Sequence, residues 1–176
     1  ASPATVRRDF NRLAEQRLVQ RARGGVLKSS GARDGLIPPF SQREVRFSRE
    51  KHAIARAAAD LLRPEDVVII GAGTTTYHLA GCLPHFPLKV ITNSLRLASV
   101  LGEKGLGESQ VEVYMVGGFL YPKASILLGP QSRAGFAQYH ANWTFMSVGG
   151  LDGDGLYNTN ELVVETERAM VEHSER

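Results

Sequence analysis

Small residues that can donate hydrogen bonds follow four apolar stretches of this sequence, and their chemistry suits an anion. The four segments are GAGTTT (71–76), TNS (92–94), GG (117–118) and GGLDGDG (149–155). Glycine lets backbone N–H groups approach an anion, and threonine hydroxyls at a helix N-terminus add donors where the helix dipole favours negative charge. Simple capping of a helix by Thr74, Thr75 or Thr76 explains the first segment equally well, so both interpretations stay open.

Other kinds of site have weaker support. Residues 71–76 lack the third glycine of the dinucleotide fingerprint, and the chain has no G-K-[ST] phosphate loop. Asp152 and Glu161 could supply the carboxylates that an aldose-ketose isomerase needs, but no histidine accompanies them. The histidines show neither metal-ligand nor catalytic spacing, so no metal site is predicted from His52, His78, His85, His140 and His173.

Alternating strands and helices would bring the four segments together. Apolar runs predict strands over 67–70, 88–92, 111–116 and 143–148, and helical patterns follow over 75–80, 95–102 and 161–173. A further helix over 49–62 would have its apolar face at Ile54, Ala57, Ala58, Leu61 and Leu62. Strands with intervening helices are typical of a parallel α/β sheet, in which ligands bind outside the carboxyl ends of the strands.

The N-terminal third of the chain has a different character. Residues 1–56 contain 13 Lys and Arg against 5 Asp and Glu, a net charge of +8, whereas the remainder has 8 against 13, a net charge of −5. A helix is predicted to begin at Ser2 and Pro3, and a basic ribbon with a turn at Gly24 and Gly25 follows it. Such a helix suits the major groove of DNA, although a solvated surface explains the charge alone. The candidate DNA contacts are Ser2, Thr5, Arg7, Arg8, Arg12, Arg21 and Arg23.

Two stretches of the chain resemble the DeoR family of bacterial transcriptional regulators. Residues 2–26, SPATVRRDFNRLAEQRLVQRARGGV, are similar to its recognition helix and wing. The matching positions are Ser2, Ala4, Thr5, Arg7, Arg8, Asp9, Leu13, Arg21, Gly24 and Gly25. Residues 40–173 resemble the family's effector-sensing domain through GAGTTTYHLA, VITNSL, YMVGG and ELVVETERAMV.

The resemblance implies three regions. Residues 1–27 would be the C-terminal part of a winged helix-turn-helix, residues 28–48 a linker, and residues 49–176 an α/β sensor domain similar to ribose-5-phosphate isomerase. It also implies that both domains continue beyond the two ends of this chain. One position departs from the family pattern, because a lysine that is usual in the last helix is replaced by Glu167.

The function implied by the resemblance is a DNA-binding transcriptional repressor of a sugar-metabolism operon, relieved by a phosphorylated sugar bound at the strand ends. No catalytic residue and no cofactor would be needed. The implied effector contacts are Gly71, Gly73, Thr74, Thr75, Thr76, Thr92, Asn93, Gly117, Gly118 and Asp152. A sugar-phosphate isomerase or deaminase-like enzyme using Asp152 and Glu161 is the alternative, but it would need neither the basic helix nor the linker.

Expected partners follow from the same picture. Operator DNA and a small phosphorylated sugar would be ligands, and a homo-oligomer is expected because recognition helices normally act in pairs on repeated half-sites. No stretch approaches the roughly 18 apolar residues that a membrane helix needs. A cytoplasmic protein without a membrane partner is therefore expected.

Overall fold

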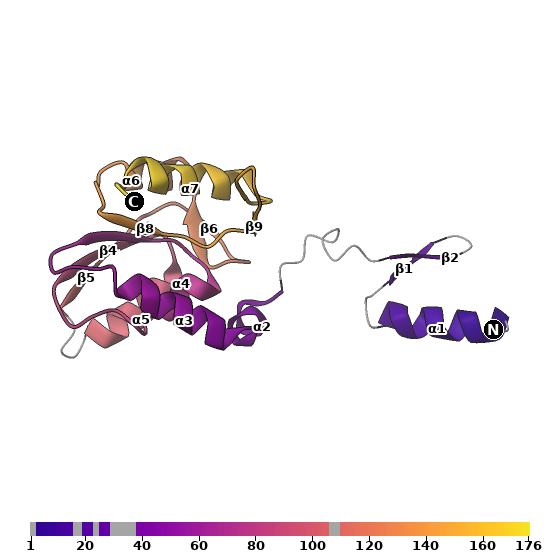
Figure 1. Ribbon diagram of the computed structural model, residues 1–176. Helices are drawn as coiled ribbons and strands as arrows, with labels where there is room; N and C mark the ends of the chain where they lie inside the picture. Colours follow the sequence, from indigo (N-terminus) through magenta and orange to yellow (C-terminus); the bar gives the residue numbers. More distant parts are fainter. Residues whose placement is uncertain (1–2, 16–18, 23–24, 29–37, 106–109) are drawn as a thin grey trace. The chain divides into compact units, whose positions relative to one another are not determined.

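The computed structural model describes residues 3–15, 19–22, 25–28, 38–105 and 110–176 of the chain. The chain divides into two compact units, Ala1–Pro38 and Pro39–Arg176 (Figure 1). The first unit carries the basic helix and ribbon, and the second carries the four strand-end segments.

In its described residues, the N-terminal unit has one helix and one two-stranded ribbon, as the sequence predicts. Helix α1 spans Pro3–Glu15 and therefore begins at the expected proline. Strands β1 (Val19–Ala22) and β2 (Gly25–Lys28) pair in the antiparallel direction. Because the last residue of β1 lies opposite the first residue of β2, the two strands form a tight hairpin beside the helix.

The C-terminal unit is built around a four-stranded parallel sheet. In spatial order its strands are β5 (Val111–Met115), β4 (Leu88–Thr92), β3 (Val67–Ile70) and β8 (Trp143–Phe145). Val68 lies opposite Val90 of β4 and Trp143 of β8. The central strands are mostly apolar because helices cover both faces of the sheet, so side chains that point either way are largely buried; Lys89 of β4 is the exposed exception. The predicted fold class, an α/β unit with a parallel sheet, is confirmed.

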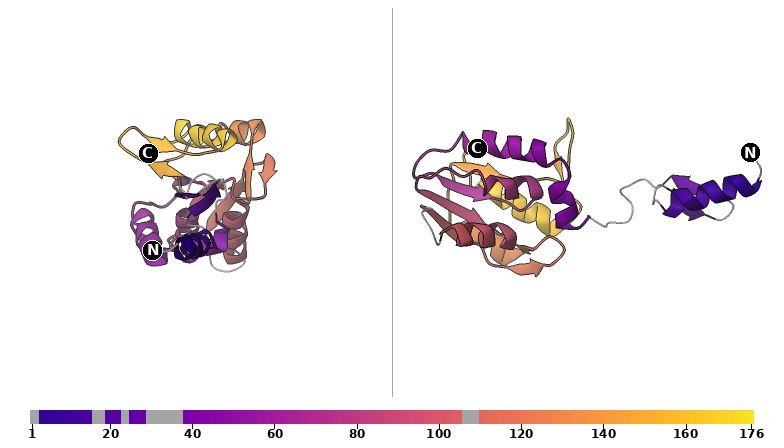
Figure 2. Two further views of the ribbon diagram at one scale, coloured as in Figure 1. Left: turned by 90° about the vertical axis from the view of Figure 1, so that its right-hand side faces the viewer. Right: turned by 90° about the horizontal axis from the view of Figure 1, so that it is seen from below.

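Helices cover the sheet in two layers (Figures 1 and 2). One face carries α3 (Ser48–Ala59), α4 (Thr74–Leu79) and α5 (Leu95–Gly105), whose apolar residues pack with Val68, Ile70 and Val90. The other face carries α6 (Pro130–Phe136) and α7 (Glu161–Glu172), which pack with Ile69 and Ile91. Alternate residues of β3 therefore stabilise opposite layers, which fixes the strand at the centre of the unit.

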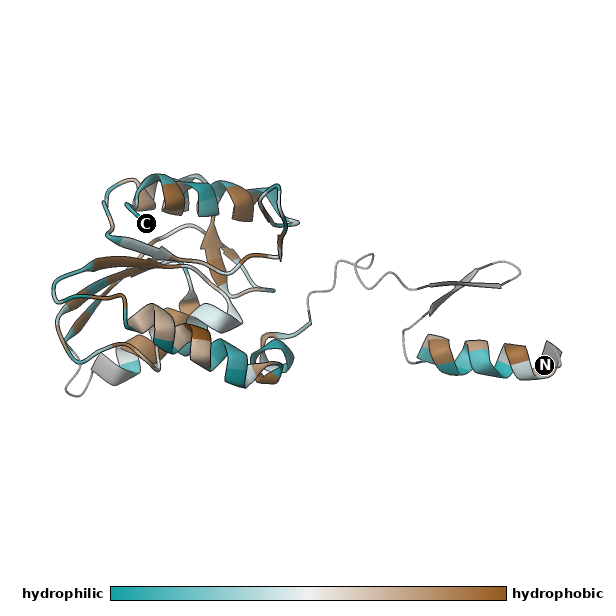
Figure 3. Ribbon diagram, in the orientation of Figure 1, coloured by the Kyte–Doolittle hydropathy of each residue, from teal (hydrophilic) through white to brown (hydrophobic). Residues whose placement is uncertain are grey.

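Hydropathy follows these layers. Figure 3 shows apolar colours on the strands and on the inner sides of the helices, and hydrophilic colours on their outer sides. Within the described ranges, no helix has both the length and the apolar content to cross a membrane.

Several short elements were not predicted from the sequence. They are helix α2 (Phe40–Val45), helix α6, and two antiparallel hairpins made of β6 (Phe119–Tyr121) with β7 (Ile126–Leu128) and of β9 (Gly150–Leu151) with β10 (Leu156–Tyr157). In addition, the strands expected over 111–116 and 143–148 end at Met115 and Phe145. The residues beyond these ends form the strand-end loops instead.

The linker expected over 28–48 is not irregular throughout, because α2 occupies residues 40–45 of it. The ring of Phe40 packs edge-on against Tyr77 of α4, with 5.2 Å between ring centroids, and lies 4.5 Å from the guanidinium carbon of Arg96 on α5. These distant partners explain the difference, since the burial that stabilises the helix cannot be read from the local pattern.

The apolar face predicted for the helix over 49–62 is only partly correct. Ile54, Ala57 and Leu61 are exposed, whereas Ala55 and Leu62 are buried. The face of this helix that carries Ala55, Ala58 and Ala59 points inward, whereas the face with the larger Ile54 is exposed. Small side chains let α3 approach α4 closely, which the count of large apolar residues does not reveal.

Candidate functional site

The order of the strands places the predicted site at a point where the chain changes direction across the sheet. From β3 the chain continues to β4 and β5 on one side, and it later returns to β8 on the other side of β3. Helix α4, which follows β3, packs on one face, and α7, which follows β8, packs on the other. Parallel α/β sheets bind ligands in the crevice that forms at such a point, beyond the carboxyl ends of the strands.

The loops after β3 and β8 touch at Gly73. A Cβ atom at this position would lie 2.1 Å from Ser147 Oγ and 2.3 Å from Ser147 Cβ, so no larger residue fits without movement of one loop. Gly71 also lies close to the second loop, because its N–H donates to Phe145 O at 2.9 Å. Glycine at 73 therefore lets the two loops meet.

The threonines at 74–76 do not cap helix α4. The helix begins at Thr74 with Gly73 as N-cap, and no side chain accepts a capping hydrogen bond. Thr76 Oγ1 instead donates to Gly73 O at 3.2 Å. Thr74 and Thr76 are buried, and Thr75 is half-buried. The capping interpretation left open by the sequence is thus not the arrangement found, and the first-turn N–H groups have no acceptor within the helix.

The turn after β4 is held by its own side chains. Thr92 is wholly buried, and its Oγ1 donates to Ile70 O at 2.6 Å and accepts from Ser94 N at 3.0 Å. Asn93 Nδ2 donates to Leu127 O at 2.8 Å, and Asn93 Oδ1 is buried without a hydrogen-bond partner. The hydroxyl of Thr92 fixes the turn to β3, whereas the carbonyl oxygen of Asn93 is still able to accept a bond.

The paired glycines after β5 have a local packing role. Gly118 has φ +146°, and a Cβ there would lie 2.5 Å from Leu128 O and 2.6 Å from Ser132 Oγ. Gly117 O accepts a hydrogen bond from Ser132 Oγ at 2.6 Å. Gly118 is therefore needed where the chain passes β7 and α6. Nothing in its surroundings requires a ligand as the explanation.

Neither Asp152 nor Glu161 forms a hydrogen bond to the loops after β3 and β4 among the described residues. Asp152 is exposed in the hairpin between β9 and β10, and it accepts from Asp154 N at 2.9 Å and Gly155 N at 3.2 Å. The first of these bonds is the main reason why the pKa of the Asp152 carboxyl is lowered. Glu161 is the exposed first residue of α7. The carboxylate of Asp152 stabilises a turn and is a weakened base.

Two residues with unsatisfied or perturbed polar groups near these loops were not predicted as part of the site. Ser147 Oγ is buried without a hydrogen-bond partner, directly beside Gly73. Glu167 of α7 is half-buried and accepts from Asn158 Nδ2 at 3.2 Å. Burial raises the pKa of its carboxyl to about 7, against the opposing effect of the Asn158 bond. Ser147 was not predicted as a site residue because the strand was expected to continue to residue 148.

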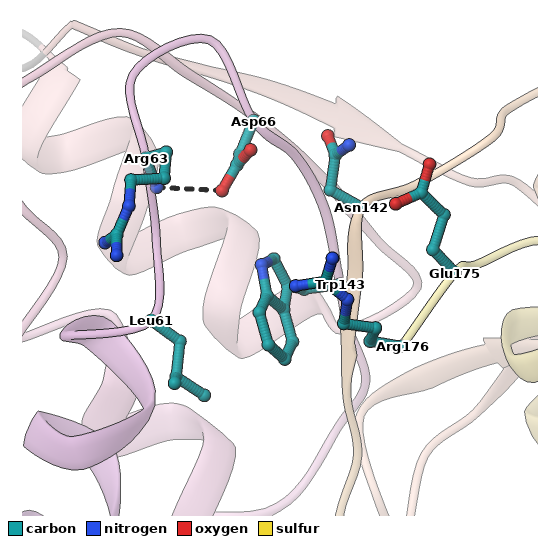
Figure 4. A pocket seen from close by; sticks show the side chains of 7 residues that line it. All are labelled: Leu61, Arg63, Asp66, Asn142, Trp143, Glu175 and Arg176. Atoms are coloured by element: carbon teal, nitrogen blue, oxygen red, sulfur yellow. Dashed lines mark hydrogen bonds between the residues drawn. The ribbon is translucent and has the colours of Figure 1, made fainter.

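A separate cavity lies at the opposite edge of the sheet (Figure 4). It has a volume of about 350 Å³ and is lined by Leu61, Arg63, Asp66, Asn142, Trp143, Glu175 and Arg176. Asn142 Oδ1 accepts from Val67 N at 2.9 Å, so the cavity lies where β3 and β8 begin. Arg63 N donates to Asp66 Oδ2 at 2.8 Å, and the guanidinium of Arg176 lies over Trp143. None of the predicted site residues lines it, so it is not the candidate site.

The predicted DNA contacts are described only in part. Arg8 and Arg12 are exposed on α1, and Thr5 is half-buried on the same helix. Their spacing of three and four residues places them along one side of the helix. Ser2, Arg23 and the side chains of Arg7 and Arg21 lie outside the described residues.

Two protein families match the chain, one in each unit. The DeoR C terminal sensor domain family matches residues 46–176, and the DeoR-like helix-turn-helix domain family matches residues 1–30. The sensor-domain match lies within the C-terminal unit, and the helix-turn-helix match lies within the N-terminal unit. Together they cover almost all of the chain.

Three curated relatives show the same similarity. The HTH-type transcriptional repressor CsqR of Escherichia coli is 38% identical over 170 residues, which cover 94% of this chain and 62% of CsqR. The uncharacterized HTH-type transcriptional regulator YulB of Bacillus subtilis is 33% identical over 173 residues, covering 98% of this chain and 65% of YulB. The HTH-type transcriptional regulator UlaR of Salmonella newport is 34% identical over 170 residues, covering 97% and 65%. The chain thus spans slightly less than two thirds of the length of these relatives.

Proposed function

The chain belongs to the DeoR family of transcriptional regulators, and we propose that it connects a DNA-reading helix to a sensor for a phosphorylated sugar in a repressor. CsqR is named as a repressor, and YulB and UlaR are named as regulators. Operator DNA is the partner of the N-terminal unit, and the phosphorylated sugar is the ligand of the C-terminal unit. No cofactor takes part.

The exposed arginines of α1 support the DNA-binding role. Arg8 and Arg12 are exposed on one side of the helix. They belong to a segment with a net positive charge, whereas the net charge of the sensor unit is negative. Cationic side chains on a helix that enters the major groove can contact bases or phosphates, and phosphate neutralisation supplies much of the affinity. The basic hairpin after α1 contributes further charge beside the groove.

The observation that carries the ligand proposal is a pair of buried oxygen atoms without partners. Asn93 Oδ1 and Ser147 Oγ belong to the loops after β4 and β8, which flank the Gly73 loop on its two sides. A buried polar group without a hydrogen bond costs about 1–3 kcal/mol, and a ligand that bonds to both oxygens would remove this cost. A sugar hydroxyl can donate to Asn93 Oδ1, and Ser147 Oγ can donate to an anionic oxygen.

The Gly73 loop supplies the complementary donors for a phosphate. The first-turn N–H groups of α4 have no intrahelical acceptor, and the half-buried Thr75 in the same turn has a hydroxyl that can donate as well. A phosphate at residues 73–76 would place the rest of the ligand toward the loops that contain Asn93 and Ser147. The combination of anion donors and hydroxyl acceptors favours a phosphorylated sugar over an inorganic anion.

Regulation follows from thermodynamic linkage. If operator DNA and the phosphorylated sugar prefer different arrangements of the protein, each ligand weakens the binding of the other by the same factor. Repression is relieved when the sugar phosphate is bound. A homo-oligomer would present two recognition helices to repeated half-sites.

The isomerase or deaminase alternative has less support. Its proposed base, Asp152, is exposed and bonded to backbone N–H groups that lower its pKa, whereas a general base works best with a pKa near the operating pH. The relatives named above carry the names of regulators. We therefore assign no catalytic residue.

Ser147→Ala in the full-length protein tests the ligand proposal, because two measured quantities should change in opposite directions. Removal of a buried hydroxyl without a partner should raise the free energy of unfolding of the ligand-free protein by up to about 1 kcal/mol. The same change should reduce the rise in melting temperature that sugar phosphates cause. Ser132→Ala is the matched control, since its buried Oγ donates to Gly117 O; it should lower stability and leave the ligand response intact. A Ser147→Ala protein with an undiminished response would remove Ser147 from the site.

A further inference from the structure

Helix α7 brings Glu167 over the carboxyl edge of the sheet. The helix ends where β8 begins, because Ala141 N donates to His173 O at 2.9 Å, so α7 runs antiparallel to the strands. Met170 lies level with the end of β3, since its Sδ is 3.3 Å from the Cβ position of Gly71. Glu167 is three residues earlier on the same side of the helix, about 4.5 Å farther along the axis. Its carboxyl therefore projects beyond the strand ends, where the proposed ligand lies.

The surroundings of Glu167 contain a neutral donor but no counter-ion. Asn158 Nδ2 donates to one carboxyl oxygen at 3.2 Å, and Asn158 itself lies against Gly149 in the segment that follows β8. No lysine or arginine in the described ranges forms an ion pair with Glu167. A half-buried carboxyl with one neutral partner retains hydrogen-bonding capacity on its second oxygen. Burial raises the pKa of this carboxyl to about 7, and the Asn158 bond opposes that shift.

On this basis we propose that Glu167 determines the ligand specificity of the sensor: it selects phosphorylated sugars whose far end is neutral or cationic and rejects those that end in a carboxylate. The proposal rests on the proposed function, because it assumes that the phosphate binds at residues 73–76. With the phosphate there, the opposite end of the ligand faces α7.

The chemistry of the carboxyl explains the direction of this selectivity. A protonated carboxyl can donate to a sugar hydroxyl and an ionised one can accept from it, so a neutral polyol is accepted in either state. A ligand carboxylate would bring a second negative charge next to the half-buried Glu167, which forms no ion pair with a lysine or arginine of the described ranges, and this is unfavourable. Discrimination therefore arises from repulsion of the wrong ligand as well as from attraction of the right one.

Matched pairs of ligands provide the test. Binding of full-length protein is measured by calorimetry with glucose 6-phosphate against 6-phosphogluconate, and with glyceraldehyde 3-phosphate against 3-phosphoglycerate, with inorganic phosphate as the common reference. The wild-type protein should bind the neutral member of a pair at least about tenfold more tightly than the acidic member. Glu167→Gln keeps the shape and the Asn158 contact, and it should tighten binding of the acidic member by about tenfold while changing the neutral member by less than about threefold.

Glu165→Gln is the control for a general change in surface charge, because Glu165 is exposed on the same helix two residues away. It should leave the ratio of affinities unchanged. Equal effects of Glu165→Gln and Glu167→Gln, or wild-type preference for the acidic member, would overturn the assignment of Glu167. If the wild-type protein binds no sugar phosphate more tightly than inorganic phosphate, the proposed function itself fails. Binding without discrimination in any pair refutes only the role of Glu167.

Discussion

Replacement of Gly73 by alanine tests whether the loops after β3 and β8 form one packed unit. The new Cβ would lie 2.1 Å from Ser147 Oγ and 2.3 Å from Ser147 Cβ, more than 1 Å inside the 3.4 Å at which ordinary contact begins. Neither atom is the far end of a long side chain. Relief of the overlap therefore requires the backbone of one loop to move.

The expected loss of stability can be estimated from two opposing effects. Overpacking of a closely packed site costs about 1–3 kcal/mol. Gly73 has φ 162°, which is extended backbone that alanine also adopts, so no backbone strain is added. Alanine in place of glycine also restricts the unfolded chain and returns about 0.4–1 kcal/mol. The net destabilisation of Gly73→Ala should thus be about 1.3 kcal/mol, the centre of a range of about 0–2.6 kcal/mol.

Urea unfolding of the full-length protein measures this loss. The midpoint should fall while the slope of the transition stays constant, since the amount of buried surface is little changed. Gly117→Ala is the control, because a Cβ at that glycine has no atom within 4 Å. In the double variant with Ser147→Gly both overlapping atoms are absent, so the two substitutions should be coupled by about 1 kcal/mol or more. A Gly73→Ala protein as stable as the wild type, or additive effects in the double variant, would refute the loop contact.

Two further predictions concern the charged residues of each unit. Arg8→Ala in the full-length protein should weaken operator binding by about 1–3 kcal/mol if Arg8 reads a base, or reduce the salt dependence by about one unit if it contacts phosphate; unchanged binding across a salt titration would exclude both. Glu167 has a folded-state pKa raised from 4.5 to about 7, so stability should decline as pH rises from about 4.5 to 7, where the unfolded state releases the proton first. The decline should be about 1–2 kcal/mol, because solvent partly screens this half-buried group, and chemical denaturation of Glu167→Gln should show a flatter pH profile.

The sheet was predictable because apolar residues dominate its central strands. The bounds expected for β3 and β4 match those observed, since polar or small residues stop each run at the point where the chain leaves the sheet. The short hairpins and α6 were missed for the opposite reason. Their few residues include glycine and proline, and the contacts that stabilise them come from distant segments such as the Gly118 turn.

The sequence predicted which strand-end loops make up the candidate site, but it did not predict which of their polar groups are used in hydrogen bonds within the protein. Thr92 and Asn93 are neighbours in one turn, yet the hydroxyl of Thr92 is occupied by Ile70 O, and Asn93 Oδ1 has no partner. These contacts span more than twenty residues and depend on the strand order. Ser147 belongs to the site because β8 ends at Phe145, so its hydroxyl lies in the loop beside Gly73.

The contacts of Phe40 connect the start of the C-terminal unit to two helices that follow the candidate site. The ring rests on Tyr77 of α4 and beside Arg96 of α5, and these two helices begin at the loops that contain Gly73 and Asn93. The polypeptide enters the C-terminal unit one residue before Phe40. Because Phe40 contacts both helices, a displacement of α4 or α5 would reach the residue next to the point of entry.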